Sequence, residues 1–218
     1  MLATRSRILN AAEGLFADRG FSATSVRMIT SRAKVNLAAM HYHFGSKDQL
    51  IQELFALRLS PLNRQRLALL DRCQAGGGAG EPSLEQILEA FVRPPVQLIR
   101  DPERGGMRFM QLLSRAFNSP DGAIREMIYG QFAEVIERFS GALGPRLPHL
   151  SREEAFWRFH FMVGAMSHTL HVIADWKNLE NLFLDVPEPS QVDEVVDRLV
   201  SFLAAGFRTP IPSRENCR

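Results

Sequence analysis

The side chains best suited to bind a polyanion lie close together, between Arg27 and Lys47. These two residues carry positive charge, Tyr42 carries a hydroxyl group, and His41 and His43 carry imidazoles. Such groups donate hydrogen bonds to phosphate oxygens, and an imidazole can also bond to the edge of a base. The sequence shows no nucleophile elbow, no paired-carboxylate pattern and no metal-ligand cluster. We therefore expect binding rather than catalysis, with no metal and no cofactor.

The elements that must position these side chains are two short helices, joined by a turn at Lys34-Val35. Ser25 can cap the first helix, and Asn36 can cap the second, which we expect from Leu37 to about His43. A helix of about two turns is too short to be stable by itself, so its neighbours must hold it. Two helices with such a turn form a helix-turn-helix unit, whose second helix enters the major groove of DNA.

The charge distribution supports this interpretation. Residues 1–50 contain seven Arg or Lys and three Asp or Glu side chains, whereas the whole chain has a net charge of only +2. A basic N-terminal quarter indicates a nucleic-acid-binding head attached to a body with another task. We predict a helix-turn-helix domain at 1–50, a body at 51–208 and a frayed tail at 209–218.

Composition is that of a soluble globular protein. Hydrophobic residues make up 45% of the chain, enough for a packed core, and the two cysteines are Cys73 and Cys217. Two cysteines exclude a disulfide framework and a cysteine-based zinc finger. The sequence shows no signal-peptide pattern and no apolar run long enough to cross a bilayer, so we expect a cytoplasmic protein without a membrane partner.

The apolar spacing predicts an all-α protein. It indicates a first helix at 3–19 and a long helix that opens at the capping box from Ser46 to Gln49. Pro61 should bend or interrupt this long helix, and Pro94-Pro95 should kink or split the helix that begins at Ser83. Further helices are expected at 107–117, 122–143, 152–179 and 191–207.

The helix-turn-helix region strongly resembles the DNA-binding domain of the TetR family of bacterial regulators. The resemblance covers about residues 5–55 and rests on GFSAT at 20–24, Ile29, Ala33-x-Val35, MHYHFGSK at 40–47 and Lys47-x-x-Leu50. It implies a three-helix DNA-binding head and a helical ligand-binding and dimerisation domain. It also implies a homodimer that binds a palindromic operator in double-stranded DNA.

Five residues have roles that follow from their places on the two helices. Leu37, Ala38 and His41 lie on the part of the second helix that faces base edges, where the apolar pair can contact thymine methyl groups. Asn36, as the cap, lies near the DNA backbone. Arg27, on the first helix, can reach a phosphate or a neighbouring base.

Tyr42, His43 and Lys47 match family positions that typically contact phosphates. For Tyr42 and His43 the alternative is a packing role against the first helix. Two departures from the family pattern matter. Lys34 replaces the usual glycine in a turn that often needs a positive φ, so the turn should be strained or differently shaped. Thr30-Ser31 replaces an alanine-containing pair.

The body should supply the dimer interface. Segment 152–176 is apolar nearly all round, and with the last helix it should form a four-helix contact between two copies. Packing within one chain is the alternative. His160, His168 and His171 share a side of this segment, but without a metal-ligand pattern they are better explained as ordinary helix histidines.

The many Met and Phe side chains of the body could line an adaptable apolar cavity. The segments VNLAAMHYHFGSK, FWRFHFMVGAMSHTL and FLAAGFR resemble fatty-acid-responsive repressors of the family. This resemblance implies a small apolar ligand such as a fatty acid or an acyl thioester. In an apolar cavity of the body, Arg108, Arg115 or His160 are the candidates for binding its acidic end. The expected pocket residues are Phe91, Met110, Phe117, Phe132, Trp157, His160 and Phe161.

The sequence thus predicts a transcriptional repressor that an apolar ligand releases from its operator. Two alternatives stay open. One is a ligand-independent regulator or an activator, whose body serves only dimerisation. The other, more remote, is an enzyme with an appended DNA-binding head.

Overall fold

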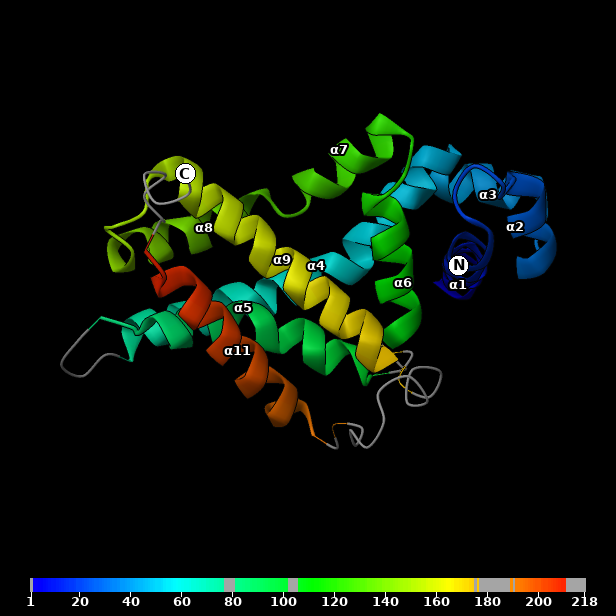
Figure 1. The fold of residues 1–218 in the computed structure, drawn as a ribbon. Helices are drawn as coiled ribbons and strands as arrows, with labels where there is room; N and C mark the ends of the chain where they lie inside the picture. The colour runs from blue at the N-terminus through cyan, green and yellow to red at the C-terminus, as the bar shows by residue number, and fades with distance from the viewer. Residues whose placement is uncertain are drawn as a thin grey trace, which may run out of the picture. The chain divides into compact units, whose positions relative to one another are not determined.

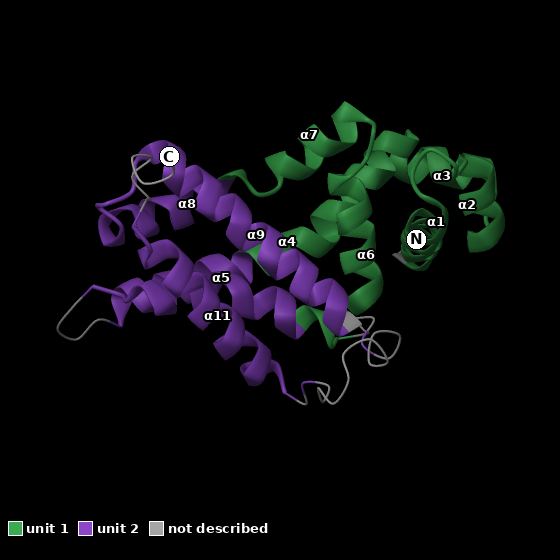
Figure 2. Ribbon diagram, in the orientation of Figure 1, with its two compact units in different colours: residues 1–63, 98–133 green, residues 64–97, 134–218 purple. Residues whose placement is uncertain are grey.

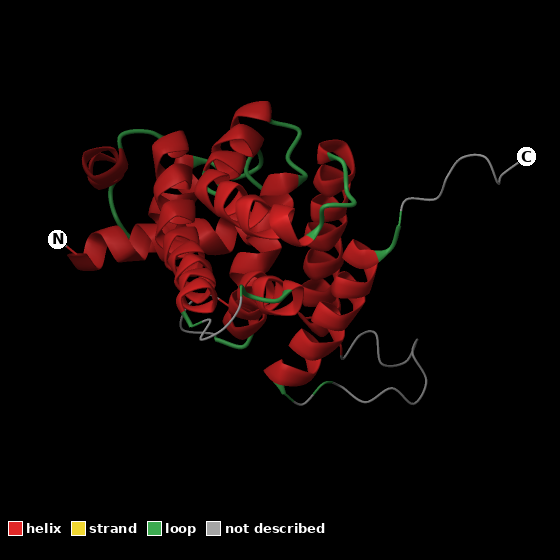
Figure 3. Cartoon of the chain, turned by 90° about the vertical axis from the view of Figure 1, so that its left-hand side faces the viewer, coloured by secondary structure: helices red, strands yellow, loops and turns green. Residues whose placement is uncertain are grey.

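The computed structural model describes residues 2–76, 81–101, 106–174, 176, 189 and 191–210. Every regular element in these ranges is a helix (Figures 1 and 3), as the apolar spacing predicts. Among them, no helix has the length and apolar character needed to cross a membrane. Most of the predicted tail and the last residues of the predicted 152–179 helix lie outside the described residues.

The chain forms two compact units (Figure 2), one from residues 1–63 and 98–133 and the other from residues 64–97 and 134–218. Unit 1 holds α1 (Leu2–Arg19), α2 (Val26–Ala33), α3 (Leu37–Phe44), the start of α4 (Lys47–Ala75), α6 (Gly106–Phe117) and α7 (Gly122–Gly130). Unit 2 holds the rest of α4, most of α5 (Leu84–Ile99), α8 (Ala133–Leu143), the 3-10 helix η1 (Gly144–Arg146), α9 (Arg152–Ala174) and α11 (Val192–Arg208).

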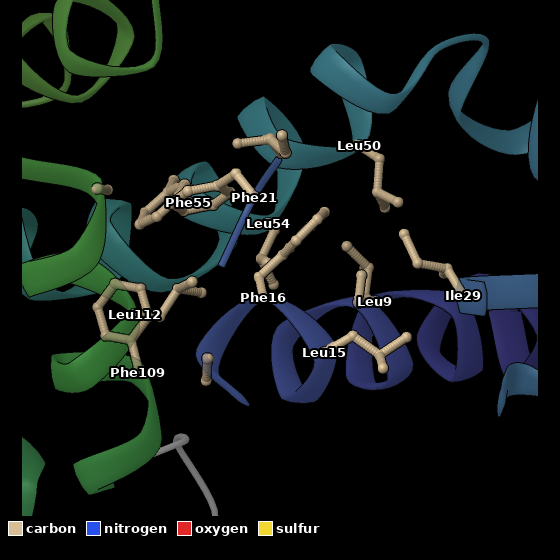
Figure 4. Packing of buried hydrophobic residues seen from close by; sticks show 14 of the residues in the cluster. Leu9, Leu15, Phe16, Phe21, Ile29, Leu50, Leu54, Phe55, Phe109 and Leu112 are labelled. Atoms are coloured by element: carbon tan, nitrogen blue, oxygen red, sulfur yellow. The ribbon is translucent and has the colours of Figure 1, made fainter. Parts of the chain in front are cut away.

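The core of unit 1 lies between α1, the start of α4 and α6 (Figure 4). Phe16, Phe55 and Phe109 are fully buried there. Phe21 joins them, with its ring centroid 5.2 Å from that of Phe16 and 6.1 Å from that of Phe55. The three-helix head therefore shares one core with α6, which packs directly on α1.

A buried ion pair joins α1 to α4. Arg58 donates to Oε2 of Glu13 through Nε at 3.2 Å and Nη2 at 2.7 Å, and the Glu13 side chain is only 5% exposed. A carboxylate at this depth needs its cation, because removing one partner of a buried pair leaves an uncompensated charge.

Unit 2 is built around α5, α8, α9 and α11. The Phe91 ring makes edge contacts with Phe139 and Phe159, at centroid distances of 5.1 and 5.5 Å. The buried Arg158 of α9 donates to the carbonyls of Gly206 and Phe207 at 2.8 and 2.9 Å. These carbonyls end α11, where a helix favours a positive charge, so Arg158 fixes α9 against α11.

The sequence predicted either a bend or an interruption of the helices at their prolines, and the helices are not interrupted. α4 runs through Pro61, and α5 runs through Pro94 and Pro95. Pro95 cannot donate to the carbonyl of Phe91 four residues earlier. Arg66 of α4 takes its place, with Nε 2.9 Å from that oxygen and the guanidinium carbon 4.2 Å from the centre of the Phe91 ring. Burial lowers the pKa of Arg66 to about 9.

The prediction of one helix at 122–143 is wrong, because two helices, α7 and α8, lie there. The break follows Gly130, a poor helix former. The N–H of Gln131 turns back to Ile128 at 3.1 Å, and that of Phe132 turns back to Tyr129 at 3.0 Å. Asn63 of α4 donates to the carbonyl of Gln131 at 2.7 Å, which a continuous helix would have used internally.

Candidate nucleic-acid interface

The turn between α2 and α3 has a lysine in the left-handed conformation. Ser25 caps α2 as predicted, accepting from the N–H of Met28 at 3.3 Å. At the other end Lys34 has φ 53° and ψ 50°, where a residue other than glycine costs roughly 1–2 kcal/mol. The Val35 N–H donates to Thr30 at 3.0 Å and the Lys34 N–H to Ser31 at 3.1 Å, the Schellman arrangement. Lys34 therefore adopts the left-handed conformation that suits a glycine, and this conformation is strained for a lysine.

Two carbonyl oxygens at this turn accept hydrogen bonds from a side chain of α1. Arg7 donates through Nη2 to the carbonyl of Ala33 and, at 2.7 Å, to that of Lys34. These oxygens lie at and beyond the C-terminal end of α2, where a cation is favourable.

Helix α3 is amphipathic across its short length. Asn36 caps it, with Oδ1 2.8 Å from the N–H of Ala39. Met40 and Phe44 point into the core and are buried. Leu37 is 44% exposed and Tyr42 is 72% exposed, so the opposite face is open. Ala38 and His41 lie exposed beside them.

The ring orientation of His41 is set by the backbone. Its Nδ1 lies 2.8 Å from the carbonyl oxygen of Gly45. Because a carbonyl can only accept, Nδ1 is the donor in this bond, and the tautomer with its proton on Nδ1 has Nε2 as an acceptor. An acceptor in the major groove pairs with the amino group of adenine or cytosine.

The junction between α3 and α4 is short and is held by hydrogen bonds of a capping box. Gly45 has φ 70°, and a Cβ atom there would lie 2.2 Å from Oε1 of Gln49. Ser46 and Gln49 form the predicted capping box: the Ser46 N–H donates to Oε1 of Gln49, and the Gln49 N–H donates to Oγ of Ser46, both at 3.1 Å.

The predicted phosphate-binding residues differ in their exposure and in the contacts that they already make. Arg27 is exposed on the first turn of α2, and Tyr42 is exposed on α3. His43 is half-buried, with its ring 5.2 Å from that of Tyr42. Lys47, also half-buried, donates from Nζ to the carbonyl of Phe21 at 2.6 Å. Lys47 thus also holds the start of α4 against the loop after α1.

Sequence reasoning missed the residues that support this surface. Arg7 holds the turn, while Arg5 forms an ion pair with Glu53 and lies 5.5 Å from the Phe44 ring centre. The buried Thr24 donates to the carbonyls of Leu15 and Gly20 at 3.2 and 2.8 Å. In the sequence both arginines count as basic residues of a DNA-binding head, and nothing there separates an internal contact from a phosphate contact.

The residues predicted to line a ligand pocket fall into three groups. Phe91 is buried in the aromatic cluster of unit 2. Met110, Phe117 and Phe132 are half-buried against the core of unit 1. Trp157, His160 and Phe161 are exposed on α9, and the candidate cations Arg108 and Arg115 are exposed on α6. The seven predicted pocket residues are thus divided between unit 1 and unit 2.

The exposed residues of α9 belong to a set of exposed aromatic side chains on α9 and α11, two helices that contact each other, and we call this set the aromatic face. It comprises Phe156, Trp157 and Phe161 of α9 and Phe202 of α11, which are 55%, 49%, 65% and 69% exposed. The ring of His160 lies 4.1 Å from that of Phe156, and its Nδ1 lies 2.9 Å from the Phe156 carbonyl. Within the described residues, no three His, Cys, Asp or Glu side chains are grouped so that they could hold a metal.

Comparison with known proteins yields matches at both ends of the chain. Residues 8–54 match the model of bacterial regulatory proteins of the tetR family, and residues 89–206 match that of the tetracyclin repressor-like C-terminal domain. An HTH-type transcriptional repressor of Mycobacterium tuberculosis is 57% identical over 44 residues, or 20% of this chain and 23% of its own. An uncharacterized HTH-type transcriptional regulator of that species is 26% identical over 176 residues, or 79% of this chain and 76% of its own.

Solved structures share the fold at low identity. A TetR-family transcriptional regulator from Bordetella parapertussis superimposes with a TM-score of 0.65 at 16% identity, covering 96% of this chain and 98% of that one. A TetR-like transcriptional regulator from Rhodococcus has a TM-score of 0.58 at 20% identity, covering 93% and 94%. The family match to more than half of the chain, together with the helix-turn-helix geometry, shows that this chain belongs to the TetR family of bacterial regulators.

Proposed function

We propose that the protein is a DNA-binding transcriptional repressor that acts as a homodimer on a palindromic operator. The observation that carries this proposal is the open face of α3, which caps at both ends hold in place. Leu37 and Ala38 offer apolar contacts for thymine methyl groups, and His41 offers an acceptor. Tyr42 and Arg27 supply exposed groups for phosphates, with Asn36, His43 and Lys47 beside them.

Base reading by His41 can be tested by selection from random duplexes. His41→Ala should relax the preference at one or two base pairs of each half-site, because one acceptor is lost. Gln111→Ala, on the exposed side of α6, is the matched control and should select the wild-type sequence. An unchanged preference in His41→Ala would show that this residue does not read bases.

A phosphate contact by Lys47 has a different signature. Each lost contact lowers the slope of log affinity against log salt by about one. We expect Lys47→Ala to weaken binding evenly across sequences with such a change in slope. A loss of thermal stability without a change in slope would instead leave Lys47 only its contact with Phe21.

The aromatic face supports dimerisation through α9 and α11. Large exposed aromatic side chains on two helices that contact each other favour an interaction site, and a two-fold axis would pair these helices with their own copies. An added Cβ at Gly164 or Gly206 meets nothing within 4 Å in the single chain, which leaves room for close approach of a second copy.

Charge on this face should separate the subunits. Phe161→Glu and Phe202→Glu should yield monomers in sedimentation analysis and should lose most operator affinity, since one head contacts only a half-site. Ile136→Glu is the matched control, because Ile136 is an exposed apolar residue on α8 of the same unit. A dimer that survives both aromatic substitutions would place the interface elsewhere.

The regulating ligand is proposed to be a small apolar molecule, a fatty acid or an acyl thioester. Phe91, Met110, Phe117 and Phe132 are the predicted pocket residues that lie within or against apolar cores, where an acyl chain could enter by displacing side-chain contacts. Such a ligand weakens DNA binding only by as much as it prefers the DNA-incompetent conformation. Helix α4 starts in unit 1 and ends in unit 2, so it is the proposed link.

Lipid extraction of the purified protein, followed by mass spectrometry, tests this ligand class. An acyl species that co-purifies and lowers operator affinity when added back would support ligand-controlled repression. Operator binding that no acyl compound alters would favour the ligand-independent alternative. A reporter gene placed behind the selected operator separates repression from activation by the sign of the change.

A further inference from the structure

We propose that Arg7 is a positioning residue for DNA recognition, which holds the turn between α2 and α3 so that α3 meets the groove in one orientation. The inference rests on the proposed DNA-binding function and assigns a role to a residue outside the helix-turn-helix. It starts from Lys34, the one residue besides glycine with a positive φ in the described part of the chain.

The two bonds of Arg7 fix the torsions of Lys34. The carbonyl of Ala33 belongs to the peptide plane before Lys34, and the carbonyl of Lys34 belongs to the plane after it. Rotation of the first plane changes φ of Lys34, and rotation of the second changes ψ. Because Nη2 of Arg7 donates to both oxygens, a change in either torsion would break a hydrogen bond to a charged donor.

These torsions decide where α3 begins. Only Val35 separates Lys34 from the cap Asn36, so a rotation at Lys34 is carried directly into the axis of α3. Glycine would adopt this conformation without assistance, whereas lysine favours right-handed or extended backbone. The arginine therefore compensates locally for the lysine.

Arg5 supports the other end of the same helix. Its guanidinium lies 5.5 Å from the centre of the Phe44 ring, and Phe44 is the last residue of α3. The first turns of α1 thus hold the turn before α3 through Arg7 and contact the last residue of α3 through Arg5. Such support from residues of α1, just before α3 and at its end, is what precise positioning of a recognition helix requires.

The experiment compares Arg7→Ala, Lys34→Gly and the double variant with the wild type. The probe is the duplex that wild-type protein selects from random DNA, and affinity is measured over a range of salt. We expect Arg7→Ala to bind roughly tenfold more weakly, as the loss of one charged hydrogen-bond donor predicts. Its salt slope should stay at the wild-type value, because no phosphate contact is removed. Lys34→Gly should restore most of the affinity in the double variant.

Arg27→Ala provides the reference for a phosphate contact: its salt slope should fall by about one, and Lys34→Gly should not rescue it. A fall of about one in the slope of Arg7→Ala, or no rescue by Lys34→Gly, would overturn the positioning role. Should Arg7→Ala fail to fold, a folded double variant that binds the duplex supports the proposal, and an unfolded one overturns it. If the wild type selects no duplex, the proposed function and this inference fail together; an unrescued Arg7→Ala beside a binding wild type refutes the inference alone.

Discussion

The bond from Arg66 to the carbonyl that Pro95 leaves free makes a quantitative prediction. Arg66→Met leaves the Phe91 oxygen buried without this donor, at a cost of about 1–3 kcal/mol, and removes a cation–π contact of about 2 kcal/mol. The substitution also removes the cost of burying the Arg66 guanidinium, and this gain offsets part of the loss. We therefore expect a net fall of about 2 kcal/mol in the free energy of unfolding.

A double-mutant cycle with Pro95→Ala isolates the hydrogen bond. Alanine at 95 restores the N–H that reaches the Phe91 carbonyl, so Arg66→Met no longer leaves that oxygen without a donor. The cation–π and desolvation contributions are the same in both backgrounds and cancel. The predicted coupling between positions 66 and 95 is therefore about 1–2 kcal/mol.

The assay is urea denaturation of the full chain, followed by circular dichroism at one fixed protein concentration, because a dimer's stability depends on concentration. Pro94→Ala is the matched control, because alanine there restores a donor to the carbonyl of Ala90 and not to the Phe91 carbonyl that Arg66 bonds. Its coupling with Arg66→Met should stay below about 0.5 kcal/mol. A coupling below about 0.5 kcal/mol for Pro95→Ala, or one of about 1–2 kcal/mol for Pro94→Ala, would refute the reasoning.

Three further predictions concern contacts in single units. Arg58→Met should lower the free energy of unfolding by about 3–5 kcal/mol because it strands Glu13, and the added change Glu13→Gln should recover part of this loss in the same denaturation assay. Asn36→Ala should cost about 1 kcal/mol of stability and weaken operator binding, whereas Asn36→Ser should retain both. The hydrogen bond from Arg208 lowers the pKa of Glu85 from its ordinary value of 4.5, so its stabilisation is present above that pH and is lost as the pH falls below it. Arg208→Ala should therefore flatten the acid limb of stability against pH, and an unaltered limb would contradict this contribution.

Local signals in the sequence predicted the head well. Ser25 and Asn36 cap the helices they precede, and the pair Ser46 and Gln49 closes its box, because each of these bonds spans only three residues. Lys34 was expected to leave its turn strained or differently shaped, and its positive φ agrees with the first alternative. Such features follow from residues near in sequence, so a single chain reveals them.

Features that depend on distant residues could not be predicted. The donor to the carbonyl that Pro95 cannot bond comes from Arg66, which is far away in the sequence. Segment 152–176 is apolar on nearly every side, so its periodicity could not show that Trp157 and Phe161 face outward. The pocket residues were chosen by side-chain type alone, and type does not distinguish a core position from a surface one.

The short junction at Gly45 and Ser46 has a consequence for engineering. The exposed residues of α3 could be exchanged for those of another regulator to change operator preference. The ring of His41, however, is hydrogen-bonded to Gly45, and the backbone of Ser46 is hydrogen-bonded to Gln49. A graft of residues 37–44 alone would separate reading residues from the groups that orient them. Chimeras that exchange 36–49 as one block should transfer operator preference intact, whereas those that cut at residue 44 should transfer it only in part.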